Sequence, residues 1–303
     1  MVPTLFSVSY AGFWGQATLD LKGFIKHAAE LGYPAVELMG KRPHLSVLDY
    51  EPEAVASLAQ HCRACGVQVA CVAGYTNFAG GAESAEVPFL EMQVHYTRAL
   101  AEFAQGLGCP LVRVFTSYER ADLPLAANWT RTATAIRECC DQVADLGVTI
   151  GIQNHHDVGV HSQALLELLH DIDRPNCKLM FDAWSPCLRG EPAYEIAKAM
   201  APHTVHTTFA DYVRLPRFAY DPALINYRPA GPDLVRAVPM GEGDLANADF
   251  LRGLRAGGFD GSVAYEMCSP LRGGGALANL DRCARRFLEW LQAPKGPGAR
   301  ALP

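Results

Sequence analysis

One short stretch of the sequence carries an unusual density of side chains that can ligate a metal or exchange protons. Directly after the apolar run 150–152 stand five such residues: Gln153, Asn154, His155, His156 and Asp157. A buried strand that delivers polar groups at its carboxyl end is the usual way in which a parallel α/β protein builds an active site. The stretch therefore predicts part of a catalytic or metal-binding site.

Chemically competent side chains also occur where other apolar runs end. They are Glu37, Arg113, Asp182, His206, Thr208 and Glu266. Two carboxylates, an amide and an imidazole from consecutive strands would form an oxygen-rich site. Such a site suits Mn²⁺ or Mg²⁺, with Co²⁺ as an alternative, better than a metal that prefers thiolates.

The elements that must position these side chains follow a regular strand-then-helix order. Apolar runs predict strands at 5–8, 35–38, 67–72, 111–115, 148–153, 178–182, 205–209 and 261–266. Amphipathic segments predict helices at 21–31, 52–65, 88–107, 128–146, 162–172, 192–200, 247–256 and 276–291. Eight such units predict a closed (β/α)8 TIM barrel, an α/β fold in a single domain over residues 1–292.

The segments around this core carry further expectations. Asn128 and Asn247 are predicted to cap the helices that begin there. Residues 211–244 are expected to form a long loop, and residues 293–303 a flexible tail, because that tail has no apolar periodicity.

Composition limits the class of protein. Half of the 303 residues are hydrophobic, 19% are charged and the net charge is −6, so no broad basic surface is available for nucleic acid. No signal peptide and no apolar run of membrane-spanning length stands out, which predicts a cytoplasmic protein without a membrane partner. The ten cysteines are scattered, and the Cys62–Cys65 pair lacks the second pair that a zinc site needs.

The strand ends resemble those of the xylose-isomerase-like barrel superfamily. The matching motifs are Val-Glu-Leu at 36–38, Gln-Asn-His at 153–155, Phe-Asp at 181–182, Ala-Asp-Tyr at 210–212, Gly-Glu-Gly-Asp at 241–244 and Tyr-Glu-Met at 265–267. The resemblance covers residues 5–292. The superfamily includes sugar-phosphate isomerases and epimerases, ketose 3-epimerases, hydroxypyruvate isomerases and inosose dehydratases, so the resemblance implies a metal-dependent carbohydrate enzyme.

The resemblance also implies four metal ligands, one each from strands five to eight: Glu, Asp, His and Glu. Asp182 and Glu266 match this pattern. Gln153 stands where the family has Glu; its amide oxygen can ligate a hard cation but is a poor base. The family's His position falls on Thr208, and His206 lies on the same face, about 6–7 Å lower in the barrel. The implied ligands are therefore Gln153, Asp182, His206 and Glu266, with Mn²⁺ as the metal. The alternatives are that Gln153 bonds to the substrate or to another ligand, and that His206 is a core histidine.

In the resembled epimerases two glutamates exchange a proton with the substrate through an enediolate. Here Glu266 is the candidate base, and Gln153 replaces its counterpart. Three routes stay open: His155 or His156 replaces the missing carboxylate, one base moves the proton on one face, or the enolate expels a leaving group. If Gln153 faces inward, an extended strand also turns His155 inward and His156 outward.

The remaining polar residues are candidates for substrate contacts: Glu37, Arg113, Asn154, Thr208 and Arg214. For Glu37 a structural ion pair is the alternative, and for Arg214, Arg217 and Arg228 a solvated position. The basic groups would clamp an anionic or polyhydroxyl substrate.

The leading hypothesis is an isomerase or epimerase of a keto sugar or sugar derivative in carbohydrate metabolism. A metal-dependent lyase or dehydratase of a 3-keto glycoside or inosose is the main alternative, and a non-catalytic sugar-binding barrel is a third. An apurinic endonuclease shares this barrel, but the acidic balance of the chain disfavours DNA binding. Homo-oligomers are common in the resembled family.

Overall fold

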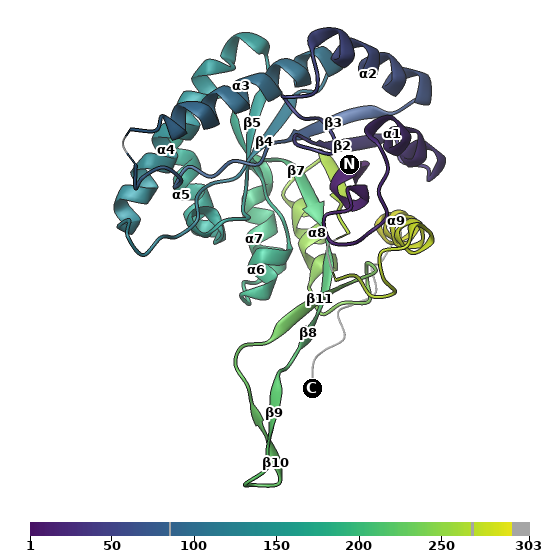
Figure 1. Ribbon diagram of the computed structural model, residues 1–303, viewed down its shortest axis with the longest axis vertical. Coiled ribbons are helices and arrows are strands. Elements are labelled where there is room, and N and C mark those ends of the chain that lie inside the picture. The colour runs from purple at the N-terminus through teal and green to yellow at the C-terminus, as the bar shows by residue number, and fades with distance from the viewer. Residues whose placement is uncertain (85, 268–269, 293–303) are drawn as a thin grey trace.

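The computed structural model describes residues 1–84, 86–267 and 270–292. Eight parallel strands close into a barrel in the order β1-β12-β7-β6-β5-β4-β3-β2 (Figure 1). They are β1 (Val2–Phe6), β2 (Ala35–Met39), β3 (Gln68–Ala73), β4 (Leu111–Val114), β5 (Thr149–Gln153), β6 (Cys177–Met180), β7 (Thr204–Phe209) and β12 (Ser262–Tyr265). The predicted single-domain TIM barrel is confirmed. The predicted flexible tail, 293–303, lies outside the described residues.

The strands are apolar because both of their faces are covered. Ile150 and Ile152 of β5 are fully buried, as are Val36 and Leu38 of β2. Strands of a parallel barrel pack against the interior on one side and against helices on the other. Polar side chains are therefore tolerated mainly at the strand ends, where they can reach the mouth of the barrel or one another.

Helices surround the barrel (Figure 1). They are α1 (Leu21–Glu30), α2 (Pro52–Cys65), α3 (Phe89–Leu107), α4 (Leu125–Gln142), α5 (Ser162–Ile172), α6 (Trp184–Leu188), α7 (Ala193–Met200), α8 (Asn247–Ala256) and α9 (Leu277–Gln292). Gly66 and Gly108 end α2 and α3 with φ of 70° and 69°. This left-handed conformation, which glycine adopts without strain, turns the chain back toward the next strand.

The two predicted asparagine caps are wrong. Helix α4 already begins after Pro124, and Asn128 lies inside it, where its Nδ2 donates to the Tyr118 carbonyl at 2.9 Å. Asn247 is the first residue of α8 rather than its cap, and its Nδ2 donates to the Ala210 carbonyl at 3.2 Å. Both side chains bond to a loop carbonyl instead of to the first turn of their own helix.

The expected loop at 211–244 instead contains a projecting β-arm, residues 211–238. Its root pairs β8 (Asp211–Leu215) with β11 (Leu234–Val238), and its tip pairs β9 (Phe218–Asp221) with β10 (Asn226–Pro229), both antiparallel. Figure 1 shows the arm extending away from the barrel. Prolines at 216 and 222 interrupt the strand pattern in the sequence, which is why the arm was not predicted.

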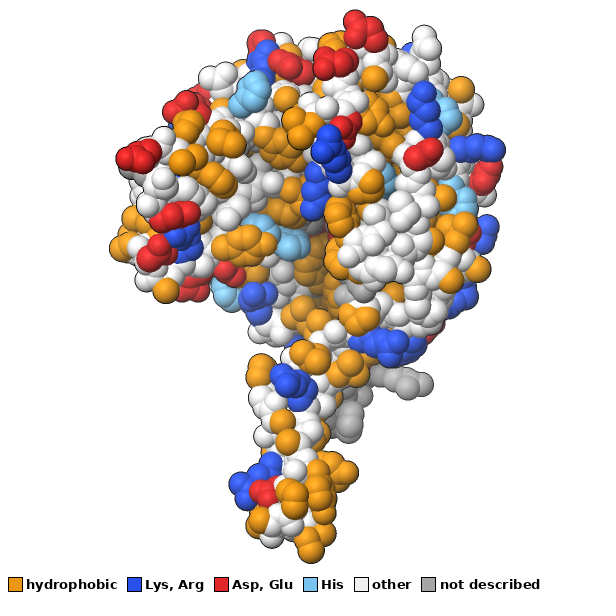
Figure 2. Space-filling view, viewed as in Figure 1, with side chains coloured by type: hydrophobic (Ala, Val, Ile, Leu, Met, Phe, Trp, Pro, Cys, Tyr) orange, Lys and Arg blue, Asp and Glu red, His pale blue; other side chains and the backbone are white. Residues whose placement is uncertain are grey.

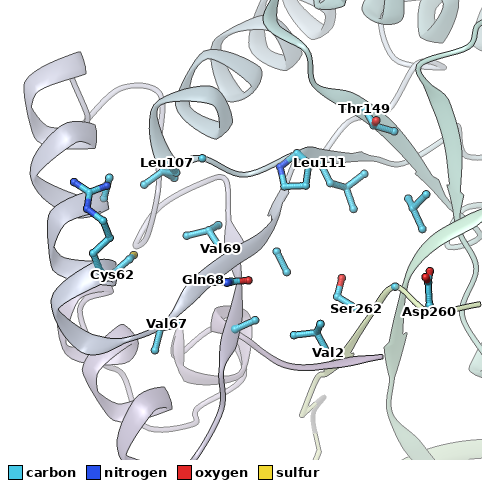
Figure 3. Close-up of a pocket in the computed structure, with 18 residues that line it drawn as sticks. Val2, Cys62, Val67, Gln68, Val69, Leu107, Leu111, Thr149, Asp260 and Ser262 are labelled. Atoms are coloured by element: carbon cyan, nitrogen blue, oxygen red, sulfur yellow. The ribbon is translucent and has the colours of Figure 1, made fainter.

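A cavity of about 700 Å³ opens at the amino-terminal end of the barrel, far from the predicted site (Figure 3). Its lining comes from the first residues of several strands, among them Val2, Gln68, Leu111, Thr149 and Ser262. Most of this lining is apolar. Among the described residues, no helix combines the length and the apolar character needed to cross a membrane.

Candidate active site

The predicted site residues gather at the carboxyl ends of the barrel strands. Glu37, Arg113, Gln153, Asp182 and Thr208 are all at most 2% exposed, and Glu266 is half-buried directly after β12. Figure 2 shows a hollow above the root of the arm, bordered by histidine, basic and hydrophobic side chains. The strand ends thus bring the predicted polar groups to one end of the molecule.

Asp182 is the most firmly held of these side chains. Its Oδ1 accepts a hydrogen bond from the Thr208 backbone N–H at 2.5 Å, and its Oδ2 accepts one from Gln153 Nε2. Asn154 bonds to the Asp182 backbone twice, accepting from its N–H at 2.7 Å and donating to its carbonyl at 3.0 Å. Asn154, predicted as a substrate contact, thus positions Asp182.

The Asp182 carboxylate lies in an environment that disfavours its charge. Burial raises the pKa of Asp182 well above its usual value, and the negative charges of Glu37 and Glu266 raise it further. The hydrogen bonds from Thr208 and Gln153 act in the opposite direction. A buried carboxylate of this kind is stabilised by a proton or by a cation at its free lone pairs.

Two buried oxygens beside Asp182 allow a test of whether the residues present fit a cation. In the described part of the chain, Gln153 Oε1 and Thr208 Oγ1 have no hydrogen-bond partner although both are shielded from solvent. Amide, hydroxyl and carboxylate oxygens are the donors that hard divalent cations prefer. No group of three His, Cys, Asp or Glu side chains suitable for a metal occurs among the described residues, so this donor set fits a cation only with its neutral oxygens included.

His206 has other partners. Its Nε2 lies 3.2 Å from Glu37 Oε2, and its Nδ1 lies 2.5 Å from Ser262 Oγ. His206 pairs in register with Ser262, at the start of β12, and therefore lies a layer below Thr208. Because both ring nitrogens are engaged, His206 supports Glu37 from below instead of facing the Asp182 cluster.

Glu37 of β2 and Arg113 of β4 form a buried ion pair, with Arg113 Nη1 3.7 Å from Glu37 Oε1. The guanidinium also donates to the Gly74 carbonyl from Nε at 3.3 Å and from Nη2 at 3.1 Å. The Cζ atom of Arg113 lies 4.3 Å from the ring centre of Phe115 and 4.7 Å from that of Tyr75. These contacts fix the plane of the Arg113 guanidinium.

Lys41, two residues beyond β2, lies near Arg113 at this end of the barrel and was not predicted from the sequence. Its Nζ lies 3.7 Å from the ring centre of Tyr75 and 4.8 Å from that of Phe13. Desolvation and the positive charge of Arg113 lower the pKa of Lys41. Its position just past a strand end was the only available signal, because stacking on aromatic rings leaves no local pattern in the sequence.

The chain does not stay extended through the two histidines after β5, so the alternation expected for an extended strand does not apply to them. The chain turns immediately after Gln153, whose carbonyl accepts a hydrogen bond from the His155 N–H at 2.9 Å. His155 is exposed, whereas His156 is 5% exposed and stacks on Tyr118 at 3.9 Å between ring centres. Although part of His155 is exposed, its ring packs against Phe115 and His156, with 4.5 Å and 4.8 Å between ring centres. Desolvation, with the positive charges of His156 and Arg113, lowers the pKa of His155 to about 3. Desolvation and the charge of Arg113 lower the pKa of His156 to about 4.

The basic residues of the arm lie apart from Asp182. Arg214 is exposed, its Nη2 donates to the Leu188 carbonyl at 2.8 Å, and its backbone N–H donates to Asp244 Oδ2. Arg228 pairs with Asp221 at 2.9 Å near the tip. These contacts brace the arm.

Asp211 shapes the Gly-Glu-Gly-Asp turn. Its Oδ2 accepts hydrogen bonds from the Gly241 N–H at 2.9 Å and the Gly243 N–H at 3.0 Å. A Cβ atom at Gly243 would lie 2.0 Å from Asp211 Oδ1, so this close approach requires glycine. Burial raises the pKa of Asp211 to about 6, although the hydrogen bonds from the turn act against this shift. The motif therefore anchors the root of the arm to the barrel.

Comparison with protein-family models shows which family this chain belongs to. The model of the xylose isomerase-like TIM barrel family matches residues 25–293. The chain belongs to this family. A comparison with curated proteins gives no match, and solved structures resemble the chain at low sequence identity.

Three solved structures have a fold similar to that of this chain. The probable 3-DHS dehydratase AsbF from Bacillus anthracis is 16% identical, with a TM-score of 0.73 over 97% of this chain and 100% of that one. A xylose isomerase domain protein from Alicyclobacillus acidocaldarius is 20% identical, with a TM-score of 0.71 over 95% and 97%. D-Psicose 3-epimerase from Clostridium cellulolyticum H10, solved with D-tagatose, is 14% identical, with a TM-score of 0.72 over 95% and 97%. At these identities the likeness shows the fold.

Proposed function

We propose that this protein is a divalent-metal-dependent isomerase or epimerase that acts on a keto sugar or sugar derivative through an enediolate. The observation that supports it best is the buried Asp182 carboxylate beside the unpartnered oxygens of Gln153 and Thr208. Structures of a sugar epimerase and of an epimerase-like protein resemble this chain, which adds support.

The residues of this chain have different roles in the proposed metal binding and proton transfer. Asp182, Gln153 and Glu266 would hold the cation, with Thr208 Oγ1 as a fourth oxygen in the ligand role that the sequence predicted for His206. Mn²⁺ is the proposed metal, with Mg²⁺ and Co²⁺ as alternatives. When bound, such a cation supplies positive charge that stabilises an enediolate oxygen. Glu266 takes the proton from the carbon next to the substrate carbonyl and returns it on the same face to the former carbonyl carbon, so that the isomerisation balances with one base.

The two histidines contribute hydrogen bonds. Because their pKa values lie near 3 and 4, both imidazoles are neutral at pH 7, and neither offers a proton readily. His155 is exposed at the mouth, where a neutral ring can bond to a substrate hydroxyl. Glu37 and Arg113 orient the substrate from the opposite wall.

A lyase or dehydratase acting on a 3-keto glycoside or an inosose is the second candidate. The neutral Gln153, where the family has Glu, leaves Glu266 as a single base on one face. Proton removal without a second base to return the proton on the other face also suits expulsion of a leaving group. The structural likeness to a probable 3-DHS dehydratase agrees with this alternative.

The experiment that tests both candidates follows deuterium in solvent D₂O. Keto sugars, 3-keto glycosides and inososes are incubated with the protein and Mn²⁺, and the carbon beside the carbonyl is monitored by NMR. Deuterium incorporation together with an isomer supports the leading proposal, and an unsaturated product supports the lyase. If Mn²⁺ binds and no substrate exchanges or reacts, both catalytic proposals fail.

We also propose that the protein is a cytoplasmic homo-oligomer with a small carbohydrate as ligand and neither nucleic acid nor membrane as partner. The arm supports association between copies, since Ile225 is 81% exposed and Tyr227 is 65% exposed. Ile225 also has φ of 51°, a costly conformation for a β-branched residue. Replacing both residues with Asp should reduce the mass measured by light scattering. An unchanged mass would contradict a role for the arm.

A further inference from the structure

The tip of the projecting arm presents apolar side chains to solvent. The exposed fractions of Phe218, Tyr220, Leu224, Ile225 and Tyr227 lie between 52% and 81%. Among the described residues, the tip strands β9 and β10 pair only with each other, and an isolated two-stranded hairpin is at best marginally stable in water. An exposed apolar surface of this kind is typical of an interaction site.

The arm also differs in charge from the rest of the chain. Residues 214–236 contain four arginines and two aspartates, a net charge of +2, and subtracting this from the total of −6 leaves −8 for the rest. Arg228 pairs with Asp221, whereas Arg217 and Arg236 are exposed and form no ion pair within the described part of the chain. A basic, apolar arm on an acidic body favours an acidic partner, and a second copy of this chain is one.

A surface of matching character lies on the loops that follow β3 and β4. We call it the acidic surface, and its residues are 82–84, 86–92 and 118–125. They include five carboxylates and one arginine, a net charge of −4. Arg120 joins the two loops, because its Nη1 donates to Glu83 Oε2 at 2.6 Å. In Figure 2, acidic and hydrophobic side chains are interspersed on the side of the barrel where α4 lies. Four hydrophobic side chains of the acidic surface are exposed: Val87, Met92, Tyr118 and Leu125.

The arm and the acidic surface lie on opposite sides of the same end of the barrel. The arm follows β7, which is separated from β3 by β6, β5 and β4 in one direction and by β12, β1 and β2 in the other. From Asp211 to Asp221 the ribbon extends roughly 30 Å, which is about the diameter of a small domain. Because the arm points away from its own barrel (Figure 1), it is placed to cross the mouth of a second copy.

We propose that the arm of one copy binds the acidic surface of a second copy, and that the second arm returns the contact in a two-fold pair. This inference rests on the proposed association between copies and names the surface that receives the arm. The three exposed aromatic rings of each tip offer roughly 300 Å², and both sides of both contacts then give roughly 1,200 Å², the lower end of standard interfaces. Tyr118 stacks on His156 at 3.9 Å between ring centres, so a bound arm also covers the rim of the second copy's mouth.

Charge reversal tests the contact from both sides. The arm variant combines Arg217→Glu with Arg236→Glu, and the surface variant combines Glu86→Lys, Glu91→Lys and Glu119→Lys, all at exposed positions. Each variant should raise the dissociation constant of the pair, measured by sedimentation velocity, about tenfold or more, because like charges then meet. An equimolar mixture of the two variants should regain most of the unaltered affinity, because each arm again meets a surface of opposite charge.

Control variants carry the same charge changes at exposed helix positions outside the arm and the acidic surface. Lys198→Glu with Arg285→Glu matches the arm variant, and Glu102→Lys, Glu138→Lys and Glu167→Lys together match the surface variant. Both controls should associate like the unaltered protein. Hydrogen exchange locates the contact: backbone amides in 86–92 and 118–125 should exchange more slowly in the unaltered protein than in the arm variant.

The outcomes separate this contact from the association itself. A surface variant that associates like the unaltered protein, or a mixture that stays monomeric, would overturn the acidic surface as the receiving site and leave the association standing. An unaltered protein that is monomeric at every concentration would overturn both. Binding of that monomer to anionic phospholipid vesicles, lost in the arm variant, would assign the arm to a membrane surface instead. Sugar turnover enters none of these readouts, so failure of the catalytic proposals leaves the contact in place.

Discussion

The two halves of the barrel mouth carry opposite charge and differ in how their side chains are held. On the β2–β4 half, Lys41 and Arg113 lie on aromatic rings. On the β5–β12 half, Asp182 is fixed by hydrogen bonds from Gln153 and Thr208, with Glu266 nearby. Arg113 is also held by hydrogen bonds, which it donates to the Gly74 carbonyl, whereas Lys41 is held over aromatic rings. The two halves thus position their charged groups by different contacts.

Glu37 connects the two halves. It pairs with Arg113 on one side and with His206 on the other, and its negative charge raises the pKa of Asp182. The positive and negative side chains are therefore not fully separated across the mouth. A substitution of a charged residue in one half should also affect the other half. The following variants test how far the halves are independent.

Replacing the base should have the largest effect. Glu266→Gln keeps the size of the side chain but removes its ability to accept a proton, so kcat should fall by about 10²–10⁴-fold. The measurement is turnover of whichever keto sugar responds, with deuterium exchange as a second readout. Glu242→Gln, which changes a glutamate 41% exposed in its ion pair with Arg272, should leave kcat unchanged. A similar kcat in both variants would place the base elsewhere.

Removing the buried arginine should cost the most stability. Arg113→Met leaves Glu37 buried without its cation, and the free energy of unfolding should fall by about 3–5 kcal/mol. Urea unfolding measures this loss. Adding Glu37→Gln to the same chain should recover part of it, because the unpaired charge is removed. A double variant that is less stable than Arg113→Met would show that Glu37 has a stronger partner than Arg113.

A second carboxylate on the β5–β12 half should make stability depend on metal. Gln153→Glu places a negative charge against Asp182, so without a cation the protein should lose about 3 kcal/mol or more. Excess Mn²⁺ should raise its melting temperature more than that of the unaltered protein, and EDTA should reverse the gain. Gln60→Glu, on the exposed face of α2, is the matched control. Equal responses to Mn²⁺ would remove Gln153 from the ligand set.

The smallest expected effect is a change in acid sensitivity. The pKa of His156 is about 4 in the folded protein and near 6.5 when unfolded, so the unfolded chain binds more protons between these values. Stability should therefore fall as the pH is lowered from about 6.5 toward 4. His156→Gln should flatten this slope in melting curves, and His95→Gln, at an exposed position, should not. An unchanged slope would show that His156 already protonates in the fold.

The carboxylate half was easier to predict from the sequence than the cationic half. Apolar runs mark the strands, and the residues at their carboxyl ends must converge in a parallel barrel, which placed Gln153, Asp182 and Glu266 together. The partners of His206 depend on the register between β7 and β12, which no local pattern encodes. Lys41 was missed for a similar reason, because its aromatic neighbours come from other loops.

Ser262, at the amino-terminal end of the barrel, shows that substitutions at this end can affect the rest of the molecule. Its hydroxyl lines the cavity at the amino-terminal end and also bonds to His206, which bonds to Glu37 beside Arg113. A substitution or a chemical label at Ser262 would thus disturb a line of contacts that reaches the opposite end of the molecule. Residues for redesign in this barrel are better chosen by tracing their bonds than by the end on which they lie.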